Sequence, residues 1–268
     1  TFARKVDTAA NGIMIGDKTI TLTATRSPKE IPWADKGVDI VFECTGFFRK
    51  KDEAAEHLAA GAKKVLISAP ASGEDATIVY GVNHHTLKDS DVIVSNGSCT
   101  TNCLAPPTKV IHDAFHVESG IMTTIHSYTN DQRLLDLPHS DLRRARASAL
   151  NMIPTSTGAA KAIGLVIPDL QGKLDGLAVR VPTPNVSLVD VTYQLRKETT
   201  IEEVHTLLQS ACQKELRGVM DATTKPLVSS DFNGNSHSSV LDLSMTKLIG
   251  GRTLKLLSWY DNEIGFSH

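Results

Sequence analysis

Cys99 lies in a segment whose residue types suit covalent catalysis. The run from Ser95 to Cys103 reads Ser-Asn-Gly-Ser-Cys-Thr-Thr-Asn-Cys, follows a predicted strand and opens a predicted helix. A cysteine at a helix N-terminus meets unpaired backbone N–H groups and the positive end of the helix dipole. Both favour the thiolate, which is the nucleophile, so we expect a lowered pKa for Cys99. The hydroxyls of Ser98, Thr100 and Thr101 also suit an anion bound at this terminus.

His126 is the candidate base for this cysteine. It ends the predicted strand Thr123–His126, and a neutral imidazole within hydrogen-bond reach can take a thiol proton. The chain has ten histidines, so residue type alone does not select this one. An inert, buried Cys99 in a Ser/Thr-rich helix cap therefore stays open as an alternative. A metal site at Cys99 and Cys103 is disfavoured because no further ligands follow at close spacing.

The first part of the chain alternates strands with a helix. Apolar residues alternate around Gly16-Asp17, which predicts a β-hairpin. A helix is predicted at Asp52–Ala60, with Gly61 placed to end it. Because strands and helix alternate, we expect a mostly parallel sheet. The predicted strands are Val38–Glu43, Lys64–Ser68, Thr77–Val82 and Val92–Ser95.

The second part contains more and longer strands, which predicts a mixed or antiparallel sheet covered by helices. Residues 129–150 are polar and lack periodicity, and loops of that length are usually functional or disordered. Pro106-Pro107 predicts a kink or irregularity in the helix after Cys103. The predicted strands are Ile121–Tyr128, Val186–Leu195, Ser238–Met245 and Thr253–Tyr260, and the predicted helices are Thr157–Val166 and 200–214, the latter opened by a capping box of Thr200 and Glu203.

Composition excludes several classes of protein. The 268 residues are 41% hydrophobic and 22% charged, with a net charge of −2, which argues for a packed core and against disorder or a general nucleic-acid binder. No apolar run approaches the roughly 18–20 residues of a membrane helix. The four cysteines form no dense framework of the secreted type, so a reducing cytoplasm is the expected location.

Five motifs, in their order and spacing, resemble the phosphorylating glyceraldehyde-3-phosphate dehydrogenase family. The similarity covers essentially the whole chain. The motifs are Ser-Cys-Thr-Thr-Asn-Cys at 98–103, His-Ser-Tyr-Thr-Asn-Asp at 126–131, Thr-Ser-Thr-Gly-Ala-Ala-Lys at 155–161, Arg-Val-Pro-Thr-Pro-Asn-Val at 180–186 and Trp-Tyr-Asp-Asn-Glu at 259–263.

The resemblance implies an α/β fold with two domains. Residues 1–98 would be the remainder of a Rossmann-type, NAD-binding domain, and residues 99–268 an α+β catalytic domain, with the boundary near Gly97–Cys99. The family's Gly-rich phosphate loop and acidic ribose-binding residue would precede Thr1, and its closing helix would follow His268. We therefore expect the chain to be a fragment lacking both termini.

The resemblance also implies a reaction. Cys99 would attack the aldehyde of glyceraldehyde 3-phosphate to form a thiohemiacetal, with His126 assisting proton transfer. Hydride transfer to NAD would leave a thioester, which inorganic phosphate would convert to 1,3-bisphosphoglycerate in glycolysis. The implied phosphate-binding residues are Ser98, Thr100, Thr129, Arg143, Thr157, Gly158 and Arg180. Arginine suits a phosphate because its donors form a planar fork, although each of these residues taken singly could be a helix cap or an ordinary cation.

The implied cofactor is NAD, bound by residues that remain of the first domain. Leu137-Pro138 resembles the loop of NAD-preferring members, which in a homotetramer reaches a neighbour's cofactor. Ile264 and Phe266 replace a family Trp and Tyr, which is expected to alter contact with nicotinamide. The implied cofactor-binding residues are Arg26, Thr45, Gly46, Phe48, Ser68 and Asn262.

Two alternatives to the triose-phosphate enzyme are open at this point. Erythrose-4-phosphate dehydrogenase shares the cysteine and the histidine, but Thr129-Asn130-Asp131 and Thr157-Gly158 favour the triose enzyme. A catalytically silent fragment or binding protein is the second alternative, because the phosphate loop is not in this sequence. A membrane or a nucleic acid is not an expected partner.

Overall fold

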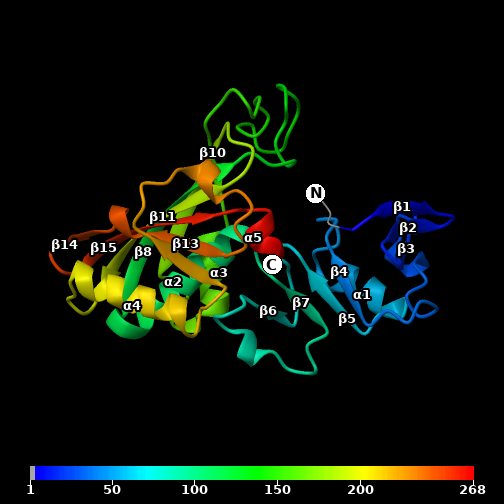
Figure 1. Ribbon diagram of the computed structural model, residues 1–268, viewed down its shortest axis with the longest axis horizontal. Helices are drawn as coiled ribbons and strands as arrows, with labels where there is room; N and C mark the ends of the chain where they lie inside the picture. The colour runs from blue at the N-terminus through cyan, green and yellow to red at the C-terminus, as the bar shows by residue number, and fades with distance from the viewer. Residues whose placement is uncertain (1–3) are drawn as a thin grey trace.

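The computed structural model describes residues 4–268, which form three sheets (Figure 1). A three-stranded antiparallel sheet and a four-stranded sheet lie in the N-terminal part, and an eight-stranded mixed sheet forms the rest. Helix α2 (Cys99–Phe115) follows the four-stranded sheet in the chain and packs against the mixed sheet. This arrangement confirms the predicted α/β class, with a parallel sheet followed by a mixed sheet.

The antiparallel sheet consists of two successive hairpins. It contains β1 (Val6–Ala9), β2 (Gly12–Ile15) and β3 (Lys18–Thr21). The turn between β2 and β3 pairs Ile15 with Lys18, and Gly16 in it has a φ of 63°. Glycine adopts this left-handed conformation without the steric penalty of other residues. The predicted hairpin at Gly16-Asp17 is therefore confirmed.

The four-stranded sheet is parallel throughout, in the order β4-β5-β7-β6. Helix α1 (Lys51–Ala59) covers it, and Ala54 of this helix packs with Val65 and Ile93 of the sheet. Its strands are β4 (Ile40–Glu43), β5 (Lys64–Ile67), β6 (Ala76–Thr77) and β7 (Ile93–Ser95).

The strand predicted at Thr77–Val82 is wrong beyond Thr77. The side chain of Asn83 accepts a hydrogen bond from the Val79 backbone N–H at 2.8 Å and donates to the Thr77 carbonyl at 2.9 Å. These bonds fold the backbone into a turn and occupy groups that a strand would use, as asparagine side chains commonly do. Two short 3₁₀ helices also lie in the N-terminal part of the chain, η1 (Pro28–Glu30) against α1 and η2 (His84–Thr86) directly after Asn83.

The mixed sheet has the strand order β12-β13-β15-β11-β8-β10-β9, with β14 also paired to β15. The central strand β8 runs parallel to β10 and antiparallel to β11. The sequence reasoning did not predict β9, β10, β12 or β14, and the strand predicted at Ser238–Met245 ends at Asp242. The strands are β8 (Val117–Ser127), β9 (Ile153–Ser156), β10 (Leu174–Val181), β11 (Ser187–Leu195), β12 (Met220–Thr223), β13 (Ser239–Asp242), β14 (Lys247–Ile249) and β15 (Thr253–Tyr260).

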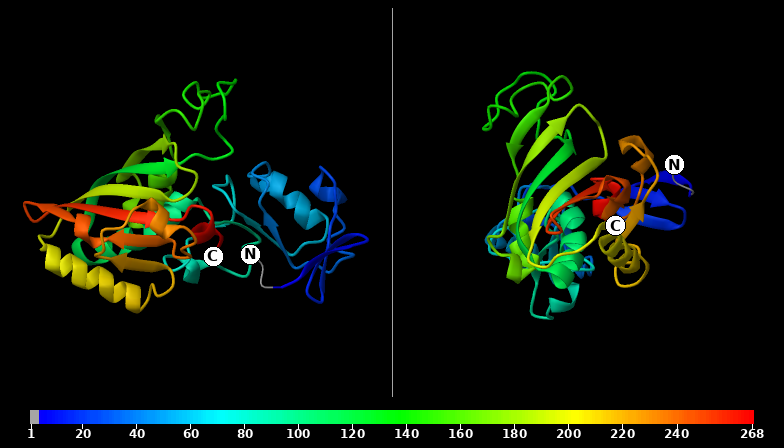
Figure 2. Two further views of the ribbon diagram at one scale, coloured as in Figure 1. Left: turned by 45° about the horizontal axis from the view of Figure 1, so that its top comes forward. Right: turned by 90° about the vertical axis from the view of Figure 1, so that its left-hand side faces the viewer.

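Helices α2, α3 (Ala159–Val166) and α4 (Ile201–Gln213) pack on one face of this sheet (Figure 2). Along β8 the side chains alternate, so Met122 is buried under the helices while Ile121 is 71% exposed on the other face. The remaining short helices are η3 (Pro168–Leu170), η4 (Ser229–Phe232), η5 (Leu243–Met245) and α5 (Ile264–Ser267).

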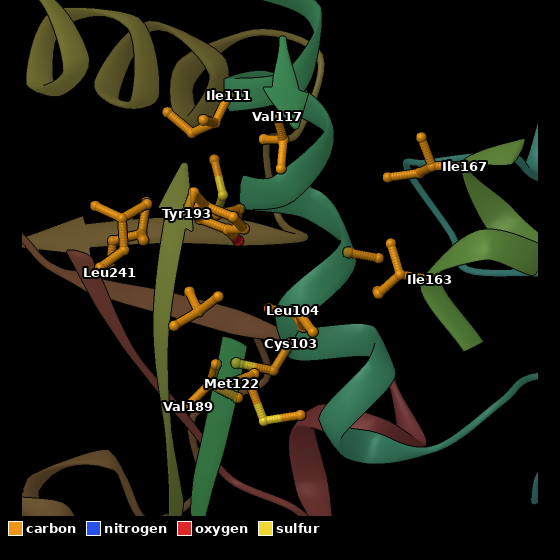
Figure 3. Packing of buried hydrophobic residues seen from close by; sticks show 14 of the residues in the cluster. Cys103, Leu104, Ile111, Val117, Met122, Ile163, Ile167, Val189, Tyr193 and Leu241 are labelled. Atoms are coloured by element: carbon orange, nitrogen blue, oxygen red, sulfur yellow. The ribbon is translucent and has the colours of Figure 1, made fainter. Parts of the chain in front are cut away.

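The main hydrophobic core lies between α2 and the mixed sheet (Figure 3). Cys103, Leu104 and Ile111 of α2 lie in it with Met122 of β8 and Tyr193 of β11. Helix α2 is continuous to Phe115, so Pro106-Pro107 does not interrupt it, and the kink expected there stays a prediction. Both prolines are buried, and the packing of this long helix compensates for the roughly 3 kcal/mol that an interior proline costs.

Candidate active site

Cys99 and His126 meet at one end of the mixed sheet. Cys99 is the first residue of α2 and His126 lies near the end of β8, and Cys99 Sγ is 3.5 Å from His126 Nε2. Ser98 caps α2, because its Oγ accepts a hydrogen bond from the Thr101 backbone N–H at 3.1 Å. The two residues that the sequence reasoning selected are therefore within hydrogen-bond reach.

A cavity of about 630 Å³ opens beside this pair and is lined by both parts of the chain. Ser68 and Gly97 line it just beyond the carboxyl ends of the parallel strands β5 and β7, where α/β proteins usually bind ligands. Asn262 and Phe266, which follow β15, line it as well. Cys99 thus faces a space shared by the parallel and the mixed sheet.

Arg180 lies directly beside the base. Arg180 of β10 is the register partner of His126 on β8, and its guanidinium donates to the Ser127 carbonyl at 2.9 Å. The same guanidinium contacts His126 Nδ1. Within residues 4–268, Arg180 Nε is buried with no hydrogen-bond partner, and the side chain lines the cavity. Both the fork of arginine donors and their positive charge suit a phosphate group.

The pKa of Cys99, beside His126, differs from the expectation. Burial raises the pKa of the Cys99 thiol, and a hydrogen bond from Thr100 and the charge of Arg180 oppose this only in part. The expected lowering of the Cys99 pKa is therefore wrong, because removal of the thiolate from water outweighs these contributions. Burial and the Arg180 charge lower the pKa of His126 to about 3, so the imidazole is neutral near neutral pH.

Thr129, Thr157 and Gly158 line the same cavity, close to the start of α3. Thr157 Oγ1 accepts a hydrogen bond from the Ala159 backbone N–H at 3.2 Å, so the hydroxyl proton of Thr157 is free for another acceptor. At Gly158 a side chain would meet no atom within 4 Å, so the backbone borders open space there. These groups are suitable donors to an anion.

Of the arginines in the 129–150 segment, Arg144 lines the cavity, whereas the predicted Arg143 does not. Arg144 lines the cavity, forms an ion pair with Asp131 and donates to Thr155 Oγ1 at 2.9 Å. Arg143 instead reaches the Pro154 carbonyl at 3.4 Å and is exposed. In this segment without helix or strand, neighbouring side chains point in different directions, and the sequence alone does not show which arginine points inward.

The predicted cofactor residues fall into two groups. Ser68 and Asn262 line the cavity, whereas Arg26, Thr45, Gly46 and Phe48 do not. Arg26 is exposed before η1, and the other three follow β4. Sequence reasoning missed Arg49, which ends the segment after β4 and lines the cavity. Its position beyond the carboxyl end of a predicted parallel strand was the available signal.

The residues present fit the nicotinamide end of NAD. Ser187 Oγ donates to Asn262 Oδ1 at 2.9 Å, which orients the Asn262 amide at the cavity. Ser68 and Asn262 line the same cavity as Cys99 and would hold polar groups of the cofactor.

A parallel sheet with a ligand cavity at its carboxyl edge, joined to a mixed-sheet domain that supplies a cysteine and a histidine, defines a two-domain α/β enzyme of the dehydrogenase type. Residues 98–262 match the family described as "Glyceraldehyde 3-phosphate dehydrogenase, C-terminal domain". Residues 1–51 match "Glyceraldehyde 3-phosphate dehydrogenase, NAD binding domain". The chain belongs to the glyceraldehyde-3-phosphate dehydrogenase family and is an NAD-dependent oxidoreductase.

Curated relatives support this assignment. The glyceraldehyde-3-phosphate dehydrogenase of Cereibacter sphaeroides is 57% identical over 267 residues, which is 100% of this chain and 80% of that protein. The enzyme of the same name from Geobacillus stearothermophilus is 54% identical over 265 residues, covering 98% of this chain and 79% of that protein. Among residues 4–268, no helix has the length and apolar character needed to cross a membrane.

Proposed function

We propose that the protein oxidises glyceraldehyde 3-phosphate and phosphorylates the product, with Cys99 as the covalent nucleophile and His126 as the base. The observation that carries this proposal is the 3.5 Å separation of Cys99 Sγ and His126 Nε2 at a helix N-terminus, beside a cavity that contains arginines. NAD supplies the hydride acceptor when it is bound.

His126 acts first as a general base. Because its pKa is about 3, the imidazole is neutral and can accept the thiol proton as Cys99 Sγ attacks the aldehyde carbon. Ser127 and Arg180 contact His126 Nδ1, which leaves Nε2 toward the sulfur. The attack forms a C–S bond, and the proton passes from His126 to the former carbonyl oxygen, which gives a thiohemiacetal and returns the imidazole to its neutral form. General base catalysis of this kind contributes roughly 10²–10⁴-fold.

Oxidation of the thiohemiacetal removes its carbon-bound hydrogen as hydride and its hydroxyl proton, which passes to His126. The product is a thioester on Cys99. An oxygen of inorganic phosphate then attacks the thioester carbonyl, the C–S bond breaks, and the acyl phosphate 1,3-bisphosphoglycerate leaves. The Cys99 thiolate recovers a proton from His126, which restores both residues.

Two anion sites are needed, one for the phosphate of the substrate and one for attacking phosphate. We assign Thr129 and Arg180 to the substrate phosphate, and Ser98, Thr157 and Gly158 to inorganic phosphate, with a contribution from the backbone at Thr100. Arg144 lines the same cavity beside Thr157, because it donates to Thr155 Oγ1 and to the Ser156 carbonyl. Charge-assisted hydrogen bonds of this kind contribute about 1.5–3 kcal/mol each.

The test of this function is the substitution Cys99→Ser, assayed by NADH absorbance with glyceraldehyde 3-phosphate and phosphate. We expect turnover to fall below 0.1% of wild type, an order-of-magnitude figure for loss of a covalent nucleophile. Cys103→Ser is the matched control, because Cys103 is in the core and burial raises its pKa to about 12. Full turnover by the Cys99 variant would remove Cys99 from this role.

The same assay distinguishes the triose from the tetrose substrate. We expect a higher kcat/KM for glyceraldehyde 3-phosphate than for erythrose 4-phosphate, because Thr129 and Thr157-Gly158, which resemble the phosphate sites of the triose enzyme, line the same cavity as Cys99. A preference for erythrose 4-phosphate would favour the alternative enzyme. Absence of both activities, with NAD bound, would favour a silent binding protein.

We also propose a homotetramer. The segment 129–150 carries exposed Leu134, Leu137 and Leu142, which are 73%, 56% and 83% exposed, and it extends from the body of the molecule (Figure 1). Exposed apolar side chains gathered in one place are typical of interaction surfaces. Mass determination by light scattering would test this assembly.

A further inference from the structure

Arg49 brings a third arginine to the cavity beside Cys99. It is exposed, lines the cavity and follows β4 in the chain. Within residues 4–268, the hydrogen bonds of Arg49 are those of its backbone, so its guanidinium is available to a ligand. We propose that Arg49 binds a phosphate group of the bound cofactor, from a loop that the buried carboxylate of Glu43 holds in place. This inference rests on the proposed function, because it assigns a residue to the cofactor of that reaction.

The other two arginines of the cavity are already engaged. Arg144 forms an ion pair with Asp131, the one carboxylate among the described residues that line the cavity. Arg180 donates to the Ser127 carbonyl. Both arginines come from the second part of the chain, and the proposed function uses them for the substrate phosphate and for inorganic phosphate. The cofactor adds a third anionic group, its diphosphate, and Arg49 is the cation that remains for it.

Arg49 reaches the cavity from the side of the parallel sheet. It follows β4, and Ser68 follows β5, the strand that pairs with β4 in parallel. The Ser68 backbone N–H donates to the Glu43 carbonyl at 3.0 Å, so the two strand ends are joined. α/β proteins bind nucleotides beyond the carboxyl ends of such strands, and the planar fork of arginine donors matches a phosphate group. A phosphate bound here therefore belongs to the nucleotide cofactor.

The backbone of Arg49 is held on both sides. Its N–H donates to the Phe47 carbonyl at 3.1 Å, and its carbonyl accepts from the Ser72 N–H at 3.0 Å. Ser72 lies two residues after Pro70, which also lines the cavity. Because the backbone is fixed beside the cavity wall, only the side chain of Arg49 must be ordered when a ligand binds, which lowers the entropic cost of binding.

A buried carboxylate anchors the start of this loop. Glu43 and His57 are 3% and 4% exposed, and Glu43 Oε2 lies 3.0 Å from His57 Nε2. Trp33 Nε1–H donates to His57 Nδ1 at 3.1 Å. Since an indole N–H can only donate, Nδ1 is the acceptor, and the proton of a neutral His57 is on Nε2, where it donates to Glu43. One carboxylate oxygen is thereby satisfied by the protein interior.

The second oxygen of Glu43 holds the loop itself. Glu43 Oε1 accepts from the Thr45 backbone N–H at 2.8 Å and also from the Thr45 hydroxyl. Thr45 Oγ1 in turn accepts from the Phe47 N–H at 3.2 Å. These bonds connect Glu43 to Phe47, whose carbonyl binds the Arg49 N–H. The Thr45 hydroxyl proton is used within the protein, so the loop meets the cofactor's charge through Arg49.

Calorimetric binding of NAD to the intact protein in phosphate-free buffer tests the role of Arg49. We expect Arg49→Gln to weaken NAD binding by about fivefold to tenfold at low ionic strength, the effect of losing one charge-assisted hydrogen bond. The difference from wild type should shrink in about 0.5 M KCl, because an exposed charge is screened by salt. ADP-ribose carries the diphosphate but no nicotinamide, so its affinity should fall by the same factor.

Lys50→Gln is the matched control. Lys50 is the next residue and is also an exposed cation, but it pairs with Glu53 at 3.4 Å and does not line the cavity. We expect this variant to change NAD affinity less than about twofold. Equal weakening in both variants would show a general effect of net charge and would overturn the proposal. Unchanged NAD affinity in Arg49→Gln, with a raised KM for inorganic phosphate, would overturn it in favour of a second anion.

A double-mutant cycle tests the anchor. Glu43→Gln replaces one accepting oxygen by an amide that cannot accept, so the loop or His57 loses its partner. In this background Arg49→Gln should change NAD affinity less than about twofold, because Arg49 is no longer held in place. Thr45→Val, at an exposed position, serves the same cycle if Glu43→Gln folds poorly.

Additive effects of Arg49→Gln and the loop variants would overturn the role of Glu43 in holding Arg49. Failure of the proposed function has a different signature, because NAD binding is measured without the reaction. In that case Cys99→Ser would keep its turnover whatever the affinities of the Arg49 variants.

Discussion

His126 and Arg180 are register partners on the parallel strands β8 and β10, so a base and a fixed positive charge lie side by side. The Arg180 guanidinium contacts His126 Nδ1 and donates to the Ser127 carbonyl. A permanent cation beside a buried imidazole disfavours its protonation, since the imidazolium would be a second positive charge. Arg180 therefore has two uses, as a phosphate-binding group and as the residue that keeps the base neutral.

Replacement of Arg180 by Gln should raise the pKa of His126. Because burial is the larger cause of the low value of about 3, we expect only a partial return toward the ordinary value of 6.5. Titration of the His126 imidazole by NMR measures this directly, with Arg143→Gln as a control in the exposed part of the loop. An unchanged His126 pKa would show that the Arg180 charge does not act on the base.

The stability of the protein should fall in acid through His126. Its folded-state pKa lies below the unfolded value of 6.5, so the unfolded chain binds more protons, and stability rises with pH between about 3 and 6.5. The contribution is present above 6.5 and is lost as pH falls toward 3, with a slope of up to about 1.4 kcal/mol per pH unit. The free energy of unfolding, measured with urea, should fall less steeply in His126→Asn than in the wild type as the pH is lowered from 6.5 to 4. Equal slopes in the two proteins would contradict a low pKa for His126.

Arg144 and Arg143 should differ in their effect on phosphate use. Arg144→Ala removes a cation that lines the cavity. It should raise the KM for phosphate by about tenfold or more, because a charge-assisted hydrogen bond to phosphate is lost. Arg143→Ala removes an exposed side chain outside the cavity and should change that KM less than about twofold. Initial rates over a range of phosphate concentrations measure both. The reverse order would restore Arg143 as the site residue.

Gly176 should tolerate no side chain. A methyl group there would lie 2.2 Å from the Met122 carbonyl oxygen on the neighbouring strand, so Gly176→Ala should destabilise the protein by more than about 3 kcal/mol. Gly172 has a φ of 74° but open space around it, so Gly172→Ala should cost only about 1–2 kcal/mol of backbone strain. Urea midpoints compare the two. Similar midpoints would show that β10 can move away from β8.

Elements with complete local patterns were predictable from the sequence. The Thr253–Tyr260 strand is found as predicted, and Thr200 caps α4 by accepting from the Glu203 backbone N–H at 3.1 Å. In a complete capping box the Glu203 carboxylate would also accept a hydrogen bond from the Thr200 backbone N–H. Here it accepts from the Thr199 hydroxyl instead. β10 was missed because Leu174–Val181 contains Gly176 and Ala178, which weaken the apolar alternation. Its strand structure comes from pairing with β8 and β9 on both sides.

Residue types and motif order were sufficient to select Cys99 and His126, since few side chains can supply a nucleophile and a base. The cavity lies beyond the carboxyl ends of β5 and β7, and its location comes from the tertiary structure. The protonation of the pair did not follow, because the pKa of Cys99 and of His126 depends on burial and on the Arg180 charge. Folding brings these three residues together from separate elements, and the resulting loss of water is a property of packing that no local pattern encodes.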